Sequence, residues 1–135
     1  MKKIILMAAL LMTTALLCAC KSGSNLADAF DEDTVKKTAA QAIDLFNAKD
    51  FQAVIDMGSD EFKALLTVEQ FASAETQLDT LGAFDSVEKF VIAGQQDEAK
   101  KDYAVVVAVG KYANGSLKFS MVFDDQMKLI QFFVE

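Results

Sequence analysis

The 135-residue chain contains no histidine, tryptophan, proline or arginine, and it has only two cysteines. Ser-His-Asp triads and Cys–His dyads need a histidine beside the nucleophile, so the sequence excludes both. Zinc and related metals draw their ligands mainly from histidine and cysteine, so such a site is excluded as well. No glycine-rich phosphate-binding pattern is present either. We therefore predict no catalytic residue, no metal and no cofactor.

Basic residues are also scarce. All 13 cations are lysines, and they face 20 acidic residues, which gives a formal charge of −7. Nucleic acids and anionic lipid headgroups are bound by clustered basic side chains. Both should repel a surface this acidic, so we expect no nucleic-acid partner.

The N-terminus has the pattern of a secretory signal peptide. Lys2 and Lys3 precede an uncharged run from Ile4 to Cys20, and a basic start followed by apolar and then small residues is typical of such signals. A transmembrane helix is the alternative, but a span needs about 20 apolar residues. This run contains two threonines and is followed by no basic cluster. We therefore exclude residues 1–19 from the fold.

Both cysteines stand at the end of this run, in Leu17-Cys18-Ala19-Cys20, which resembles a bacterial lipobox. If Cys18 were lipidated, leucines would occupy positions that usually hold small residues. We predict that Cys20 carries the lipid and that Cys18 leaves with the signal, so the two cysteines form neither a disulfide nor a metal pair. Two acyl chains give stable anchoring, at about 0.8 kcal/mol per buried methylene. The protein is expected on the extracytoplasmic face of the bacterial cell membrane, anchored by palmitate-like chains.

Residues 20–33 are predicted to form the lipidated cysteine and a flexible tether, because they show no sustained apolar period. The acidic run Asp31–Asp33 is either a solvated run ending in a helix N-cap or a metal site. It lacks the glycine and the closing glutamate of a calcium loop, so we favour the cap. Residues 34–135 then form a single domain.

The first half of this domain has helical spacing of its apolar residues. We expect a long helix, two short helices and a fourth helix that ends near Gly82. The expected N-caps are Asp33 or Thr34, Asp50, Ser59, and Thr67 in a capping box with Gln70. The side chains expected to face inward from the first three helices are Val35, Ala39, Ala42, Ile43, Phe46, Phe51, Val54, Ile55, Phe62, Leu65 and Leu66. The fourth helix is expected to run through Val68, Phe71, Ala72 and Leu78.

The second half consists of β-branched and aromatic runs bounded by turn residues. The four predicted strands cover residues 86–94, 102–112, 116–124 and 128–135. Helices followed by an antiparallel meander make an α+β domain, in which the N-terminal helices pack on one side of a curved antiparallel sheet.

Asn114-Gly115 is a strong signal for a two-residue hairpin turn, and it predicts a strand register. The predicted pairs are Tyr112 with Leu117, Gly110 with Phe119, Ala108 with Met121 and Val106 with Phe123. A second turn at Asp125-Gln126 would pair Met121 with Ile130, Phe119 with Phe132 and Leu117 with Val134. Small residues then face large ones across the strands, as a filled core requires.

The opposite face of this sheet is too apolar for plain solvent surface. Its expected side chains are Val105, Val107, Val109, Val122, Leu129 and Phe133, mixed with Lys111, Lys118, Ser120 and Gln131. Monomeric proteins seldom expose a contiguous apolar patch of more than a few hundred Å². Either the tether, a bent strand or lysine stems cover this patch, or it is a contact surface for a second copy or for another envelope protein.

Three stretches of the domain carry a resemblance, namely "FNAKDFQAVIDM", "LDTLGAFDSVEKF" and "FSMVFDDQMKLIQFF". They resemble a bacterial family of lipoprotein domains of unknown function that has the nuclear-transport-factor-2-like cone fold. The resemblance covers nearly all of residues 34–135 and implies a cone-shaped α+β domain. The family has no established catalytic residues, and the fusion of some members to hydrolase domains implies an accessory role.

Two functional hypotheses remain. The first is a lipid-anchored, extracytoplasmic, non-catalytic binding or adaptor module of the bacterial cell envelope. The alternative is a small cone-fold enzyme or carrier acting on an apolar small molecule, since cone folds can hold an aspartate base and a tyrosine in an apolar cavity. The candidates by residue type are Asp44, Asp56, Tyr103 and Tyr112. A cavity lined by a buried Asp–Tyr pair would favour the alternative, and a filled core with an exposed apolar patch would favour the first hypothesis.

Overall fold

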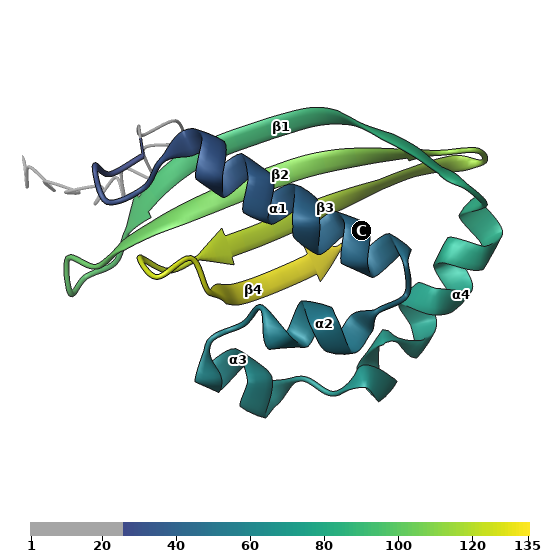
Figure 1. Ribbon diagram of the computed structural model, residues 1–135, viewed down its shortest axis with the longest axis horizontal. Coiled ribbons are helices and arrows are strands. Elements are labelled where there is room, and N and C mark those ends of the chain that lie inside the picture. Colours follow the sequence, from purple (N-terminus) through teal and green to yellow (C-terminus); the bar gives the residue numbers. More distant parts are fainter. Residues whose placement is uncertain (1–25) are drawn as a thin grey trace, which may run out of the picture.

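The computed structural model describes residues 26–135, so the predicted signal peptide and Cys20 lie outside the described residues. The helices are α1 (Glu32–Asn47), α2 (Phe51–Asp56), α3 (Asp60–Leu65), the 3-10 helix η1 (Val68–Phe71) and α4 (Ala72–Leu81). The strands are β1 (Phe84–Gln96), β2 (Asp102–Tyr112), β3 (Gly115–Phe123) and β4 (Leu129–Val134). The strands form an open, curved antiparallel sheet in the order β1-β2-β3-β4, which confirms the predicted α+β class (Figure 1). Within residues 26–135, no helix combines the length and the apolar character that a membrane crossing needs.

Helix α1 crosses one face of the sheet diagonally (Figure 1). Its predicted apolar stripe is confirmed, because Val35, Ala39, Ala42, Ile43 and Phe46 are all buried. The cap differs from the prediction. Asp31 is the N-cap, and its carboxylate accepts a hydrogen bond from the Thr34 backbone N–H at 2.9 Å. Because Phe30 is also buried, the packed domain begins before residue 34, and the later part of the predicted tether belongs to it.

The two short helices begin where the sequence predicts. The Asp50 carboxylate accepts from the Ala53 N–H at 3.2 Å, and the Ser59 hydroxyl accepts from the Phe62 N–H at 3.2 Å. Short polar side chains at these positions satisfy backbone donors that have no partner inside the helix. The chain between α2 and α3 is also joined to the sheet, since Gly58 forms a parallel bridge with Leu129.

Leu65, at the end of α3, was predicted to face the core and does not. Leu65 is 76% exposed, and Val68 is exposed as well. Helix α3 has only six residues, and Phe62 occupies its inward position. Gln70 does accept from the Thr67 N–H at 2.8 Å, as the capping box requires, but it opens η1 before α4 starts.

The β2–β3 hairpin turns one residue earlier than predicted. Ala113 and Asn114 form the turn, and Gly115 already belongs to β3, opposite Tyr112. The predicted register is therefore wrong by two residues, and the observed pairs are Gly110 with Leu117, Ala108 with Phe119, Val106 with Met121 and Ala104 with Phe123. The turn docks on α4: the Asn114 N–H donates to the Leu81 carbonyl and the Ala113 N–H to the Ala83 carbonyl, both at 2.9 Å.

The β3–β4 register is also shifted by two residues, and it contains an irregularity. Met121 pairs with Phe132 and Phe119 with Val134, while the register slips between Val122 and Phe123. The Asp124 carboxylate holds the β3–β4 turn by accepting hydrogen bonds from the N–H groups of Gln126 and Lys128, each at 2.9 Å. The slip turns Leu129 into the core, where it is fully buried, and leaves Ile130 exposed. The sequence predicted the reverse, with Leu129 on the face away from the core and Ile130 on the core face.

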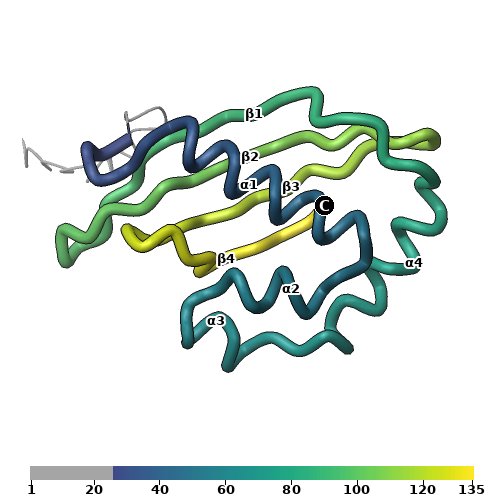
Figure 2. The backbone as a smooth tube through the Cα atoms, in the orientation of Figure 1, coloured from purple at the N-terminus to yellow at the C-terminus, as the bar shows by residue number. Residues whose placement is uncertain are grey.

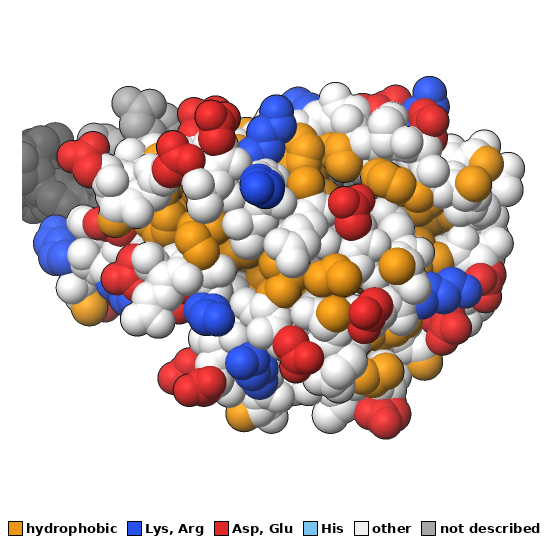
Figure 3. Space-filling model, viewed as in Figure 1, with side chains coloured by type: hydrophobic (Ala, Val, Ile, Leu, Met, Phe, Trp, Pro, Cys, Tyr) orange, Lys and Arg blue, Asp and Glu red, His pale blue; other side chains and the backbone are white. Residues whose placement is uncertain are grey.

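The core lies between the sheet and the helices, around Phe46. Its ring meets the rings of Phe51 and Phe119 edge-on, at centroid distances of 5.6 and 5.5 Å. The backbone path brings the β2–β3 turn beside α4 at one end of the sheet, whereas the β1–β2 and β3–β4 turns lie at the other end (Figure 2). On the helix side, apolar side chains gather in the middle of the surface, with charged side chains mostly around them (Figure 3).

Candidate functional site

Alternate residues of the four strands point away from α1 and form a surface that we name the outer face. Its apolar side chains are Val91, Ala93, Val105, Val107, Val109, Val122 and Phe133. Strand pairing places Val91 beside Val107, and Ser120 beside Phe133, so one row crosses the whole sheet. Val91 is 45% exposed and Phe133 is 57% exposed. Water therefore reaches apolar side chains at both edges of the outer face, which Ser120 interrupts between Val107 and Phe133.

Five of the six residues predicted for this surface lie on it, and Leu129 does not, because the slip in β4 turns it inward. The prediction missed Val91 and Ala93. Lys89, Val91 and Ala93 alternate with inward residues in β1, so the period of two was readable there. The β1–β2 connection offers no two-residue turn, so the register that would align β1 with β2 could not be read.

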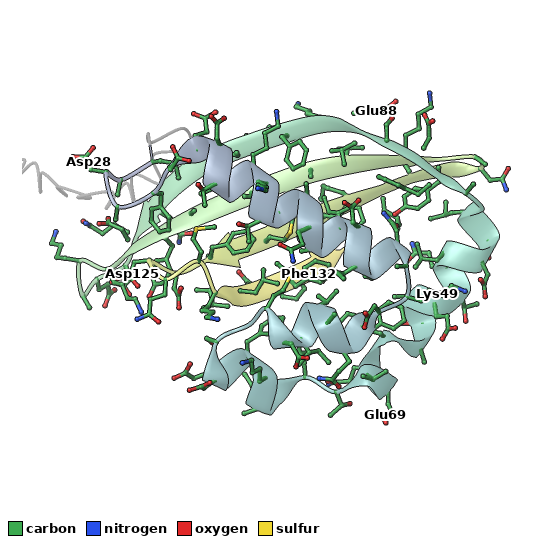
Figure 4. All side chains as sticks on the ribbon, in the orientation of Figure 1. Asp28, Lys49, Glu69, Glu88, Asp125 and Phe132 are labelled. Carbon is green, nitrogen blue, oxygen red and sulfur yellow. The ribbon has the colours of Figure 1, made fainter. Side chains whose placement is uncertain are left out.

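The outer face has one end near the β2–β3 turn and an acidic end near the β3–β4 turn, where Lys101 nevertheless lies over the Tyr103 ring. Lys89 and Lys118 pair on either side of Val109, near the β2–β3 turn, and the Lys118 ammonium forms an ion pair with Glu135. At the other end, the Tyr103 hydroxyl donates to the Asp97 carboxylate at 2.9 Å. This hydrogen bond raises the pKa of Tyr103, and burial and the negative charges of nearby aspartates act in the same direction. Asp125 extends from the β3–β4 turn at this end (Figure 4).

The size of the outer face limits what it can bind. Four strands about 4.8 Å apart and three rows of alternate residues give roughly 400 Å², and seven of these twelve positions are apolar, which leaves an apolar area of roughly 230 Å². The largest apolar patch on a typical monomer is about 300–600 Å². A standard protein–protein interface buries about 800 Å² on each partner. The apolar centre alone thus supports a weak contact.

A second feature lies on the helix side, where the ends of α1 and α4 meet the start of β1 and the end of β2. A cavity of about 220 Å³ opens there. Its lining residues are Asn47, Lys49, Leu78, Asp79, Gly82, Phe84 and Tyr112. Figure 4 shows Lys49 between the end of α1 and α4. We name this cavity the α1–α4 pocket.

Tyr112 provides the buried wall of the α1–α4 pocket. Its hydroxyl donates to Asn47 Oδ1 at 2.5 Å. Burial raises the pKa of Tyr112 to about 12, against the opposite influence of the hydrogen bond to Asn47. The phenol is therefore neutral at physiological pH, and it presents an apolar ring with a fixed polar end.

The residues proposed for the enzyme alternative do not come together. Asp44 and Asp56 are exposed on α1 and α2, and Tyr103 lies at the acidic end of the outer face. Only Tyr112 lines the α1–α4 pocket, and its partner there is an amide rather than a carboxylate. The sequence reasoning missed Asn47, Lys49 and Asp79. The predicted lipidation site, Cys20, lies outside the described residues.

Comparison with known proteins places the chain in a family. Residues 39–132 match the family described as "Protein of unknown function (DUF3887)". The chain belongs to this family. It is also similar to a protein from Ruminococcus gnavus ATCC 29149 whose structure was solved by NMR, with 29% identity and a TM-score of 0.72 over 82% of this chain and 96% of that one. The comparison with curated proteins found no match.

Proposed function

We propose that this DUF3887 protein is a lipid-anchored, non-catalytic binding module of the bacterial cell envelope, and that its outer face binds a second copy of the chain. The observation that carries the proposal is the exposure of Val91 and Phe133 at the two ends of a row that also holds Val107 and Ser120. Water contact with such a surface is costly, at roughly 25 cal/mol for each Å² of apolar area. Pairing two outer faces removes this cost for both copies.

A twofold axis that runs across the strands would let a second copy of the chain occupy the outer face. The same axis would stack the central rows of the two copies on each other. The charges at the two ends do not by themselves select an orientation, because Lys118 pairs with Glu135 at one end and Lys101 lies over the Tyr103 ring at the other.

The lipid anchor at Cys20 and the small size of the outer face fit together. An outer face of roughly 400 Å², only part of it apolar, is about half of a standard interface, so two free copies should associate weakly. Copies confined to one membrane surface meet at a much higher effective concentration. The anchor would therefore turn a weak contact into a populated dimer.

We further propose that the fold is a cone of the nuclear-transport-factor-2-like type. The supporting features are the curved four-stranded sheet and the long helix α1 that crosses its inner face. The helices cover one side of the sheet in such an arrangement, which leaves the other side available for a partner.

The proposal is tested by cross-linking the full-length chain in its own membranes. Val107→Glu combined with Phe133→Glu places two charges in the centre of the outer face, and the cross-linked dimer should be lost. Leu65→Glu is the matched control, because Leu65 lies on the helix side and is the most exposed large apolar residue within residues 26–135. It should leave the dimer intact.

Three results of this experiment would refute the proposal. The first is a wild-type chain that gives no cross-linked dimer in membranes, and the second is an outer-face variant that cross-links as well as wild type. Loss of the dimer in the Leu65→Glu control would equally show that the effect is not specific to the outer face.

A further inference from the structure

Lys49 occupies a backbone conformation that normally belongs to glycine. It follows the C-cap of α1 with φ 59°, and its N–H donates to the Phe46 carbonyl at 3.0 Å while the Asp50 N–H donates to the Leu45 carbonyl at 3.0 Å. These bonds close the helix end in the usual left-handed manner, for which glycine has no steric cost and lysine does. A side chain held at such a position invites a functional explanation.

The contacts of Lys49 add too little folding stability to explain why a lysine stands at this position. Its ammonium lies 2.5 Å from Asp79 Oδ1 and 3.8 Å from Glu75 Oε1, both on α4. All three side chains are more than one-third exposed. Exposed ion pairs of this kind contribute little to folding. The pairs do, however, hold the ammonium along the wall of the α1–α4 pocket.

The charges around the α1–α4 pocket favour an uncharged ligand. The Lys49 ammonium is compensated by Asp79, whose hydrogen bond raises the pKa of Lys49. An anion would therefore meet a neutralised lysine and two carboxylates. A cation would be repelled by the Lys49 ammonium, which already pairs with the carboxylates of Asp79 and Glu75. A neutral molecule can instead use the lysine as donor and the carboxylate as acceptor at the same time.

The remaining walls of the α1–α4 pocket describe the shape of that molecule. The rings of Phe84 and Tyr112 stand edge-to-face, 5.4 Å apart, and Leu78 adds a third apolar side chain. The cavity has a volume of about 220 Å³. It is smaller than the ~300 Å³ at which pockets for drug-sized ligands begin. One six-membered ring with its substituents fits this space.

We propose that the α1–α4 pocket binds one pyranose ring of an uncharged sugar. The ring hydroxyls would donate to Asp79 and accept from Lys49, and the C–H face of the ring would pack on Phe84. This site lies on the opposite side of the sheet from the outer face, so the proposal is independent of dimer formation.

The test uses amide NMR shifts of the full-length chain in a zwitterionic detergent. The probes are the methyl pyranosides of glucose, mannose and galactose, each added up to about 0.1 M, where weak specific sites still saturate. At least one probe should give saturable shifts centred on Lys49, Gly82 and Tyr112. Glucuronate and glucosamine, the charged counterparts, should bind at least about tenfold more weakly.

Two lysine variants separate binding from folding. Lys49→Gly keeps the helix end and removes the ammonium, so sugar binding should fall at least about tenfold with an unchanged or higher melting temperature. Lys100 also has a positive φ, of 66°, in the β1–β2 turn away from the pocket. Lys100→Gly should relieve the same kind of backbone strain and leave sugar binding unchanged.

The proposal fails if none of the three pyranosides gives saturable shifts at the pocket, or if glucuronate or glucosamine binds as well as they do. It also fails if Lys49→Gly retains full binding. A clear fall in the melting temperature of Lys49→Gly would identify the lysine as a structural clamp between α1 and α4, and this result too would overturn the assignment.

Discussion

Replacing Gly58 with alanine should destabilise the domain more than a single methyl group suggests. A Cβ atom at this position would lie 2.1 Å from Cδ1 and 2.7 Å from Cγ of Phe62, whose ring is buried. The backbone cannot easily retreat, because Leu129 holds it on both sides. The Leu129 N–H donates to the Met57 carbonyl at 3.0 Å, and the Ser59 N–H donates to the Leu129 carbonyl at 2.8 Å.

The expected cost of Gly58→Ala follows from the two ways in which the clash can be relieved. Displacement of the Phe62 ring gives up part of the ~1.5–3 kcal/mol that burial of such a side chain contributes. Retention of the ring strains the loop, and overpacking of this kind costs about 1–3 kcal/mol. We therefore expect a loss of about 1–3 kcal/mol, measured as the shift in the urea midpoint followed by circular dichroism.

A double-mutant cycle with Phe62→Ala tests the mechanism behind this loss. In the Phe62→Ala background the clashing ring is absent, so Gly58→Ala should cost less than about 1 kcal/mol. An equal cost in both backgrounds would refute the argument, because the loss would then come from the glycine backbone itself. A cost below about 0.5 kcal/mol in the wild-type background would show that the loop yields freely.

Three further predictions concern the anchor, the hairpin and a phenol. Cys20→Ala should abolish labelling by a fatty-acid analogue and release the protein from the membrane fraction, whereas labelling that survives in this variant would contradict the anchor. Gly115→Val should destabilise the domain by on the order of 1 kcal/mol or more, because φ is 158° and a Cβ atom would lie 2.7 Å from Leu81 Cδ2; an unchanged urea midpoint would contradict this. Because the folded pKa of Tyr112 is raised to about 12, its contribution to stability should be complete below the unfolded pKa of about 10 and be lost between pH ~10 and ~12. Tyr112→Phe, compared by denaturation across this range, should lack that part of the decline.

The helices could be predicted closely because their signals are local. A stripe of apolar residues and a capping side chain lie within a few positions of each other, and Asp50 and Ser59 act as caps in the structure. The errors arose where local signals compete. Asp31, Asp33 and Thr34 all suit an N-cap by type, and the choice of Asp31 depends on which helix start lets Phe30 reach the core.

The sheet shows why faces are easier to predict than pairs. A register shift of two residues leaves each side chain on its predicted face, because side chains alternate with a period of two. Val106, Ala108 and Phe119 are accordingly buried although all their predicted partners are wrong. The single-residue slip at the start of β4 has the opposite effect. It moves side chains to the other face, so that Leu129 is buried and Ile130 is exposed.

The register error and the missed pocket have one physical cause. The β2–β3 turn is held by the backbone carbonyls of Leu81 and Ala83, which accept from Asn114 and Ala113. These carbonyls become available because α4 ends at Gly82 with φ 75°. Carbonyl groups exist at every residue, so side-chain type cannot show that these two capture the turn.

The same docking of the turn on the end of α4 builds the α1–α4 pocket. It brings the end of β2 to the end of α1, so that Tyr112 reaches Asn47, which lies 65 positions earlier in the chain. Lys49 completes the wall through a backbone conformation that its residue type disfavours. A pocket formed by backbone docking and a strained lysine leaves no periodic or motif signal. The outer face was readable because its valines repeat at every second position, whereas the pocket required the packing of helix ends to be known.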